Sequence, residues 1–251
     1  MEVHSFKIEK KVHEVDTVLF PSLLKHGDKT YLIDCGYEET FEAFQQELIK
    51  LNAPIHQLTG IFISHDDIDH LGGLNAFKKR NPNLKVYSSA IEEQSVCGKV
   101  KSERLIQAEN SLEHIPNEYK NWALHFIQSL QNIKRYRVDK TFNDGDEFEK
   151  GVMVIHTPGH TKGHVALFVK KEKILIANDA LVIENDEFEI ANPNYTLDMA
   201  SAIKSVEKIR QLNPAKIICY HGGVMQYDVH EKLNRLLLRY KHKLIWDFTN
   251  E

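Results

Sequence analysis

The stretch GIFISHDDIDHLGG, residues 60–73, concentrates side chains that can bind metal ions. Its apolar start predicts a short buried strand, and His65, Asp67, Asp69 and His70 follow at the end of that strand. Neutral imidazole and carboxylate groups are common ligands of zinc, iron and manganese. Because His70 comes directly after Asp69, the two side chains must point in different directions. One loop could therefore supply ligands to two adjacent ions.

Three later segments end a predicted strand with the same residue types. They are His160 in TPGHTKGH, Asp179 in the triplet AND, and His221 in CYHGG. Residues at the ends of neighbouring strands converge in space, and loops there can carry chemistry on a rigid scaffold. Glycines that permit tight turns and close backbone approach lie beside them, at positions 72, 159, 222 and 223. The sequence therefore predicts one metal centre assembled from several strand ends.

The elements that must position these residues alternate between strand and helix. Strands are predicted within residues 17–36, 60–64, 83–89, 151–157, 164–170, 173–179 and 215–223. Helices are predicted at 39–51, 74–80, 199–209 and 228–246, with Asp198 as the cap of the third. Interleaved strands and helices indicate an α/β or α+β fold, in a single domain spanning residues 1–251.

Residues 91–135 have a different, helical pattern and are predicted to be an insertion into that domain. The apolar stripe of its second half consists of Trp122, Ala123, Phe126, Ile127 and Leu130. Two interpretations remain open. The insertion could line or cover a substrate pocket, or it could be a helical pair that buries the stripe on the core.

Composition limits the function further. The formal charge is −4, with 32 Lys and Arg against 36 Asp and Glu, and there is no basic tract typical of nucleic-acid binding. The three cysteines, Cys35, Cys97 and Cys219, are far apart and form no CxxC motif, which favours a reducing compartment. We find no signal-peptide pattern and no apolar run long enough for a membrane span, so we expect a cytoplasmic protein.

The ordered motifs resemble those of the metallo-β-lactamase superfamily over nearly the whole chain. The first metal motif of that family, HxHxDH, is matched by the sequence HDDIDH from His65 to His70, with Asp67 in place of the second histidine. The later metal residues of the family match His160, Asp179 and His221. An early aspartate, between a strand and a glycine, matches Asp34 in YLIDCG.

This resemblance implies a four-layer αβ/βα sandwich, in which two mixed sheets lie face to face with helices outside. It also implies a pair of divalent metal ions. The first ion would be bound by His65, Asp67 and His160, and the second by Asp69, His70 and His221. Asp179 would bridge the two ions, and Asp34 would form hydrogen bonds that hold the ligand loops.

Two such ions lower the pKa of a bridging water, and the resulting hydroxide can attack a carbonyl, phosphorus or sulfur centre. We therefore expect a metal-dependent hydrolase that acts on an ester, a lactone or a thioester, with Asp69 also able to relay a proton. Acyl-homoserine lactonases resemble the chain in layout, and some lactonases of the superfamily hydrogen-bond the substrate through a tyrosine. Tyr195 lies in the corresponding interval, so it is a candidate catalytic residue; packing under a loop is the alternative.

Asp67 is the departure from the lactonase pattern, which has histidine there. A third carboxylate makes the centre less positive, so the water is acidified less and oxygen-preferring ions are favoured. Zinc is the expected metal, with iron or manganese as alternatives because of Asp67. Flavodiiron proteins of the superfamily also carry a carboxylate at this position, so a diiron protein that reacts with O2 or NO is the second hypothesis. A ligand-binding protein with weak activity is the third.

The remaining residues near the motifs have simpler expectations. His164 either supports a ligand or is an ordinary strand residue, whereas His156 and Cys219 are expected to pack in the core. The expected partner is a small-molecule substrate, rather than a nucleic acid or a membrane. The oligomeric state is left open, with a dimer as one option.

Overall fold

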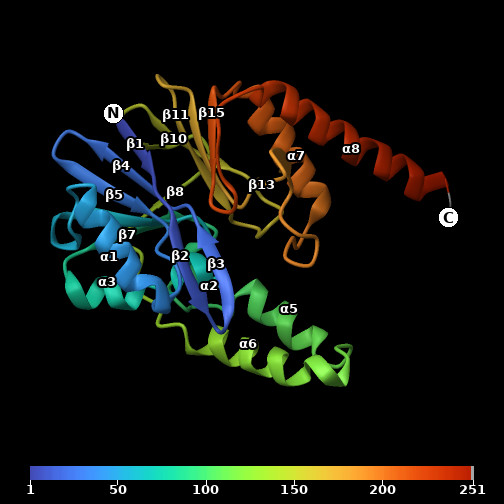
Figure 1. Ribbon diagram of the computed structural model, residues 1–251, viewed down its shortest axis with the longest axis horizontal. Coiled ribbons are helices and arrows are strands. Elements are labelled where there is room, and N and C mark those ends of the chain that lie inside the picture. The colour runs from blue at the N-terminus through green and yellow to red at the C-terminus, as the bar shows by residue number, and fades with distance from the viewer. Residues whose placement is uncertain (250–251) are drawn as a thin grey trace. The chain divides into compact units, whose positions relative to one another are not determined.

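Two six-stranded sheets dominate the computed structural model, which describes the backbone of residues 1–249 and the side chains of residues 1–241 (Figure 1). The chain contacts divide into two compact units. The first contains residues 1–4, 8–17 and 23–141, and the second contains residues 5–7, 18–22 and the chain from Phe142 onward. Each unit holds most of one sheet, so each is built around its own strands.

The first sheet has the strand order β1-β4-β5-β6-β7-β8. Its strands are β1 (Glu2–Ser5), β4 (Ser22–His26), β5 (Lys29–Ile33), β6 (Gly60–Ile63), β7 (Lys85–Ser89) and β8 (Lys140–Phe142). The central strands β5, β6 and β7 are parallel, with Ile33 opposite Phe62 and Ile63 opposite Ser88. Every residue of β6 is buried, as expected for a parallel strand covered on both faces. The carboxyl ends of β5 and β6 are thereby adjacent, which places the chain after Ile33 beside the loop after Ile63.

Helices α1 (Phe41–Lys50) and α3 (Leu74–Arg80) belong to the first unit and lie together (Figure 1). Phe77 of α3 makes edge-to-face contacts with Phe41 and Phe44 of α1, with ring centroids 5.1 Å and 5.9 Å apart. Short 3-10 turns precede and follow α1, at Glu38–Thr40 and Ile55–Gln57, and the hairpin of β2 (Ile8–Val12) and β3 (Val15–Leu19) forms a separate two-stranded sheet. Between β6 and α3, a single helical turn, α2 (Ile68–Leu71), carries part of the metal motif.

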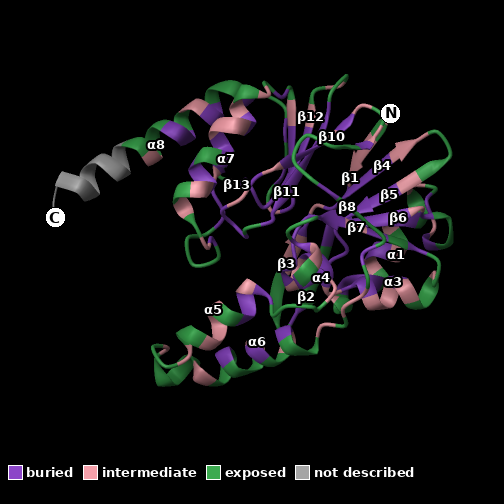
Figure 2. Ribbon diagram, turned by 180° about the vertical axis from the view of Figure 1, so that it is seen from behind, coloured by how far each residue is buried: buried purple, intermediate pink, exposed green. Residues whose placement is uncertain are grey.

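Residues 91–135 are helical, with α4 (Glu93–Val96), α5 (Glu103–Ser111), a 3-10 turn at Asn117–Tyr119, and α6 (Lys120–Asn132). Leu105 of α5 packs with Ile127 and Leu130 of α6 in a small cluster of its own. Figure 2 shows buried residues on α5 and α6 among intermediate and exposed ones. Of the predicted stripe, Ala123, Ile127 and Leu130 are buried, whereas Trp122 is 54% exposed and stacks on Phe126.

The second sheet has the order β16-β15-β12-β11-β10-β9. Its strands are β9 (Glu147–Glu149), β10 (Val152–His156), β11 (Val165–Val169), β12 (Ile174–Asn178), β15 (Lys216–Cys219) and β16 (Gly223–Met225). All neighbours are antiparallel except β12 and β15, where Asn178 lies opposite Cys219. This parallel pair brings the segments after β12 and β15 to the same edge of the sheet.

Helices α7 (Met199–Gln211) and α8 (Val229–Thr249) pack on the second sheet with the hairpin of β13 (Val182–Glu184) and β14 (Glu187–Glu189). Val206 and Ile209 of α7 and Leu233 and Leu236 of α8 are fully buried in the core of this unit. Among the described helices, none combines the length and the apolar character that a membrane crossing needs. The assignment of residues 1–251 to one domain remains a prediction.

The cap of α7 agrees with the sequence prediction and gives a first test. The Asp198 carboxylate accepts hydrogen bonds from the Ser201 backbone N–H at 3.0 Å and from the Ser201 hydroxyl at 2.7 Å. We expect Asp198→Ala to lower the free energy of unfolding by about 1 kcal/mol, because one orphan N–H of the helix loses its acceptor. Asp198→Asn, which keeps an acceptor oxygen, should retain most of the stability. Urea denaturation at neutral pH measures both variants.

The same cap predicts a pH dependence. The hydrogen bonds from Ser201 hold the pKa of Asp198 below its usual value. The charged cap therefore stabilises the fold above the unfolded-state pKa of ~3.9, and this contribution is lost as the pH falls through the lower folded-state value. The stability difference between native protein and Asp198→Ala should consequently shrink on acidification below about pH 4. A difference that grows on acidification would contradict this assignment.

Candidate metal centre

The loop after β6 and the turn α2 position the first four predicted ligands. His65 follows the strand directly, Asp67 stands at the N-cap position of α2, and Asp69 and His70 lie within the helical turn. The Asp67 side chain makes no capping hydrogen bond, although aspartate is a favoured cap. Its carboxylate is engaged elsewhere.

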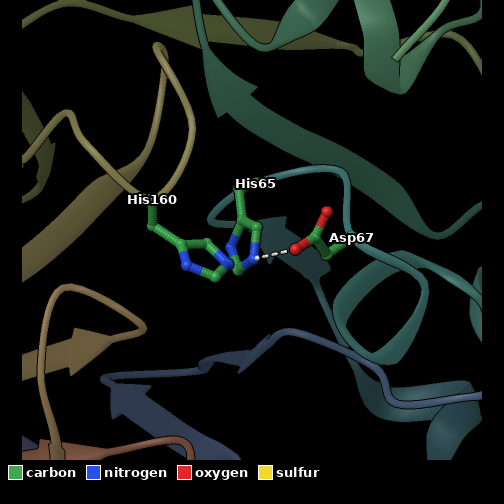
Figure 3. A group of neighbouring side chains, drawn as sticks. All are labelled: His65, Asp67 and His160. Atoms are coloured by element: carbon green, nitrogen blue, oxygen red, sulfur yellow. Dashed lines mark ion pairs between the residues drawn. The ribbon is translucent and has the colours of Figure 1, made fainter. Parts of the chain in front are cut away.

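Imidazole and carboxylate groups face each other in two pairs in this loop. The distance from His65 Nε2 to Asp67 Oδ2 is 3.6 Å (Figure 3), and the distance from His70 Nε2 to Asp69 Oδ2 is also 3.6 Å. The two imidazole rings are neighbours, with centroids 4.0 Å apart. The structure thus brings all four residues of the first motif together, and it presents an imidazole nitrogen and a carboxylate oxygen in each pair.

Asp34, at the carboxyl end of β5, holds this loop through side-chain hydrogen bonds. Its carboxylate accepts hydrogen bonds from the Ser64 N–H at 2.8 Å, from the Ser64 hydroxyl at 2.7 Å and from His70 Nδ1 at 2.8 Å. The side chain is fully buried and the backbone φ is 60°, a left-handed conformation that aspartate tolerates better than most residues. The expected supporting role of Asp34 is confirmed.

This network assigns the tautomers of both histidines. A carboxylate oxygen can only accept, so His70 Nδ1 carries the hydrogen that it donates to Asp34. The single hydrogen of the Ser64 hydroxyl is donated to Asp34, so His65 Nδ1 must donate to Ser64 Oγ across 3.0 Å. In their neutral forms, His65 and His70 therefore each present a lone pair at Nε2, the state in which imidazole binds a metal ion.

Asp67 is held by Arg104, the second residue of α5. The guanidinium Nε lies 3.1 Å from both carboxylate oxygens, and Nη2 donates to Oδ2 at 2.8 Å. Arg104 is 2% exposed and Asp67 is 8% exposed, so this is a buried, charge-assisted, two-nitrogen contact. The prediction that Asp67 lowers the positive charge of the centre omitted this arginine, which restores one positive charge.

Asp66 has an arginine of its own. Arg135 Nη1 lies 3.1 Å from Asp66 Oδ2 and also donates to the Ser95 carbonyl. Burial and the neighbouring Asp67 raise the pKa of Asp66 to about 6, against the lowering effect of Arg135. Two arginines from the helical segment therefore bind two successive aspartates of the loop.

The second unit supplies the other three predicted ligands from three strand ends. His160 lies in the loop after β10, Asp179 directly after β12, and His221 shortly after β15. Asp179 Oδ2 is 3.6 Å from His160 Nε2 and 3.5 Å from His221 Nε2. A single carboxylate oxygen thus faces both imidazoles, as a shared ligand would.

The ring of His164 positions Asp179 by binding the backbone N–H of Asp179. Its Nε2 accepts the Asp179 N–H at 3.2 Å, so the ring hydrogen sits on Nδ1, which contacts Thr157 Oγ1 at 2.8 Å. Of the two interpretations of His164, the structure favours a supporting role. Cys219 is buried, as expected. The expectation for His156 is wrong, because its half-buried ring contacts the Lys162 carbonyl at 2.8 Å and holds the loop instead of packing in the core.

Two glycines are required by close backbone contacts beside these ligands. At Gly159, with φ 137°, a Cβ atom would lie 2.4 Å from the Ala202 nitrogen of α7. At Gly222, with φ 95°, it would lie 2.2 Å from the Ile183 carbonyl oxygen, and Ile183 N–H donates to the His221 carbonyl at 3.1 Å. Any side chain at either position would displace the ligand loop.

The donor pairs fit divalent metal ions. Two ligand atoms bound to one tetrahedral ion at roughly 2.0–2.2 Å lie roughly 3.3–3.6 Å apart, which is longer than a hydrogen bond. The imidazole–carboxylate pairs within each unit are separated by 3.5–3.6 Å. Their nitrogen and oxygen donors, without thiolate, suit zinc, iron or manganese. The individual ligand roles remain predictions.

Sequence reasoning identified the candidate ligands but missed several residues that contact them or their neighbours. Arg104, Arg135, Ser64 and Thr157 carry no motif, and only the chemistry of burial hinted at the arginines, because buried carboxylates require partners. Tyr195, the candidate catalytic residue, is 42% exposed in the segment before α7. Its catalytic role remains a prediction.

Comparison with known proteins supports the resemblance seen in the motifs. The sequence model described as the metallo-beta-lactamase superfamily matches residues 20–221. The probable metallo-hydrolase YflN of Bacillus subtilis (strain 168) is 25% identical over 251 aligned residues, covering 92% of this chain and 93% of that protein. An N-acyl homoserine lactonase of Bacillus sp is 34% identical over 94 residues, which are 36% of this chain and 37% of the lactonase.

Solved structures share the fold. The metallo-beta-lactamase family protein TTHA1429 from Thermus thermophilus has a TM-score of 0.73 at 20% identity, covering 96% of this chain and 80% of that one. The metallo-beta-lactamase FIM-1 from Pseudomonas aeruginosa, in its mono-zinc form, has a TM-score of 0.65 at 13% identity, covering 95% and 92%. The predicted fold class is therefore confirmed.

The hydrogen bond between Asp34 and His70 gives a prediction for this centre. We expect Asp34→Ala to weaken metal binding by roughly 10–100-fold, because His70 loses the partner that fixes its orientation and tautomer. Asp34→Asn should fall between native and alanine, since its amide oxygen can still accept from Nδ1. Chelator competition measures the affinity, and the ¹⁵N shifts of His70 report the tautomer. Unchanged affinity and tautomer in Asp34→Ala would refute the assignment.

Proposed function

We propose that this chain, which belongs to the metallo-β-lactamase superfamily, is a hydrolase. The proposed enzyme binds two divalent metal ions and cleaves an ester, a lactone or a thioester. The observation that carries this proposal is the set of imidazole–carboxylate pairs at 3.5–3.6 Å. Hydrogen bonds prepare His65 and His70 as neutral Nε2 ligands. Burying several imidazole and carboxylate groups at strand ends is energetically unfavourable unless each has a partner, so apolar packing alone does not explain them.

The proposed assignment follows the family pattern. One ion takes His65, Asp67 and His160, and the other takes Asp69, His70 and His221. Asp179 is proposed as the shared ligand. The contact of one Asp179 oxygen with two imidazoles supports this choice.

Divalent ions held by these residues would supply a water of lowered pKa as the nucleophile, and their positive charge would stabilise a developing oxyanion. Two residues of the chain are proposed to act on the reacting groups, one by accepting a proton and the other by donating a hydrogen bond. Asp69 is proposed to accept a proton in addition to its ligand role. The Tyr195 hydroxyl is proposed to donate a hydrogen bond to the oxyanion of the substrate.

We propose a small-molecule carbonyl substrate, and one relative supports this choice. The lactonase relative is named for the hydrolysis of an N-acyl homoserine lactone, and it shares 34% identity with this chain over 94 residues. We propose zinc as the metal, in line with the mono-zinc form of FIM-1. The net charge of −4 gives no support to a nucleic-acid substrate.

The diiron redox hypothesis depended on the extra carboxylate of Asp67. Arg104 compensates that charge, so the reason to expect stabilised ferric iron is weakened. Elemental analysis of protein purified without added metal separates the two hypotheses. Two zinc ions per chain and hydrolysis of lactones, esters or thioesters would support the proposal. A coloured protein with two iron ions per chain and no hydrolysis would overturn it.

The shared role of Asp179 predicts a ranking of two variants. Asp179→Ala should abolish hydrolysis and lower the metal content, because both ions lose a ligand. Tyr195→Phe should keep both ions and lose at most roughly 10²–10³-fold in kcat, the value of one hydrogen bond to an oxyanion. Steady-state kinetics and metal analysis of the same preparations measure both effects. Equal losses in the two variants, or an active Asp179→Ala, would refute the shared-ligand mechanism.

A further inference from the structure

Arg104 is placed where an arginine is unfavourable for the helix that carries it. It lies in the first turn of α5, behind the Ser102 cap, whose hydroxyl accepts the Leu105 N–H at 3.1 Å. The helix dipole disfavours a cation at this end. The side chain is also 2% exposed, although arginine is rarely buried without a partner. Neither helix stability nor solvation explains this position, so the reason lies in what the guanidinium contacts.

The guanidinium is held on both sides. Nε and Nη2 bind the Asp67 carboxylate, and Nη1 donates to Gln107 Oε1, one turn further along α5, at 2.6 Å. The planar fork therefore fixes the plane of the carboxylate as well as its position. In this orientation Asp67 Oδ2 remains 3.6 Å from His65 Nε2, within the separation expected of two ligands of one ion.

Charge gives the second reason. The resemblance places histidine at position 67 in related lactonases, where a neutral ligand would contribute no charge. Aspartate with a buried arginine also has no net charge, so the pair Asp67–Arg104 is an electrostatic equivalent of one histidine. A lone buried carboxylate at this position would be costly.

We propose that Arg104 is a positioning residue for the metal centre, which holds Asp67 as a ligand and offsets its charge so that the pair replaces a histidine. This inference rests on the proposed function, because it assigns Asp67 to the first ion. Arg104 binds the ion only through Asp67 and is not a catalytic residue. The helical segment 91–135 is thereby part of the metal centre, since α5 supplies the residue that completes it.

The neighbouring pair provides a matched control. Arg135 also comes from the helical segment, is also largely buried and also binds an aspartate of the same loop, Asp66. Arg135→Leu therefore removes a single-nitrogen ion pair one residue away and leaves the hydrogen bonds between Arg104 and Asp67 in place. If Arg104 only attached the helices to the loop, the two leucine variants would change metal binding alike.

The experiment compares native protein with Arg104→Leu, Arg104→Lys, Asp67→His, Asp67→His/Arg104→Leu and Arg135→Leu. Metal content after zinc loading, chelator competition and the absorption of cobalt-substituted protein measure the centre without using activity. Thermal unfolding of the metal-free forms verifies folding. Arg104→Leu should lose roughly 10–100-fold in affinity for one ion, and Arg104→Lys, which keeps the charge without the fork, should lose less. Arg135→Leu should keep two ions.

The double variant is the decisive arm. Asp67→His/Arg104→Leu should regain the first ion, to which Asp67 is assigned, whereas Asp67→His alone should bind that ion less well because Arg104 is left buried against a neutral ring. The inference is overturned if Arg104→Leu binds two ions as tightly as native protein, or more tightly, or if the double variant is no better than Arg104→Leu. Native protein that binds fewer than two ions would refute the proposed function as well, so the two failures are distinguishable. If Arg104→Leu does not fold, the lysine and double variants still decide the outcome.

Discussion

The burial of three carboxylates around one short loop is the constraint on which the first unit depends. Asp34, Asp66 and Asp67 are all buried, and each would be unstable there without donors. The fold satisfies them in three ways: Asp34 with Ser64 and His70, Asp66 with Arg135, and Asp67 with Arg104. Of these contacts, those of Asp34 and Ser64 hold the imidazoles of His70 and His65 in one orientation.

The second unit solves the same problem with backbone and neutral groups. Asp179 is fixed through its own N–H by His164, and that ring is fixed in turn by Thr157. The ligand loops approach other backbone segments closely at Gly159 and Gly222. Charge pairing and hydrogen bonds therefore hold the candidate ligands of the first unit, and close backbone contacts hold those of the second. The difference predicts which substitutions each unit tolerates least. Substitutions that alter charge should be most harmful around Asp67, and substitutions that add volume should be most harmful beside His160 and His221.

Sequence alone predicted the central strands of both sheets, their ends and the candidate ligands, because these depend on local features. It did not predict short strands such as β1, β8 and the hairpin of β13 and β14. Apolar runs such as GIFI and KILI mark buried strands, and polar residues and glycines mark where the strands end. The supporting contacts could not be predicted in the same way. Arg104 lies 37 positions from Asp67 and Arg135 lies 69 from Asp66, and neither spacing has a local signature. The exposure of Trp122 could not be predicted either, since a stripe of apolar residues does not say which edge faces solvent.

The helical segment 91–135 packs around its own small core. Its connection to the loop after β6 therefore depends on a few specific contacts. Ile68 of α2 packs against that core, and the two arginines bind the residues directly before α2. Packing alone would tolerate small shifts between the helices and the loop, because apolar contacts are not directional. The guanidinium fork of Arg104 removes that freedom, because its two nitrogens fix the angle of the Asp67 carboxylate as well as its distance. The segment 91–135, predicted to be an insertion, is thus connected to residues on which the proposed chemistry depends. Substitutions in α5 are expected to alter the metal centre through Asp67.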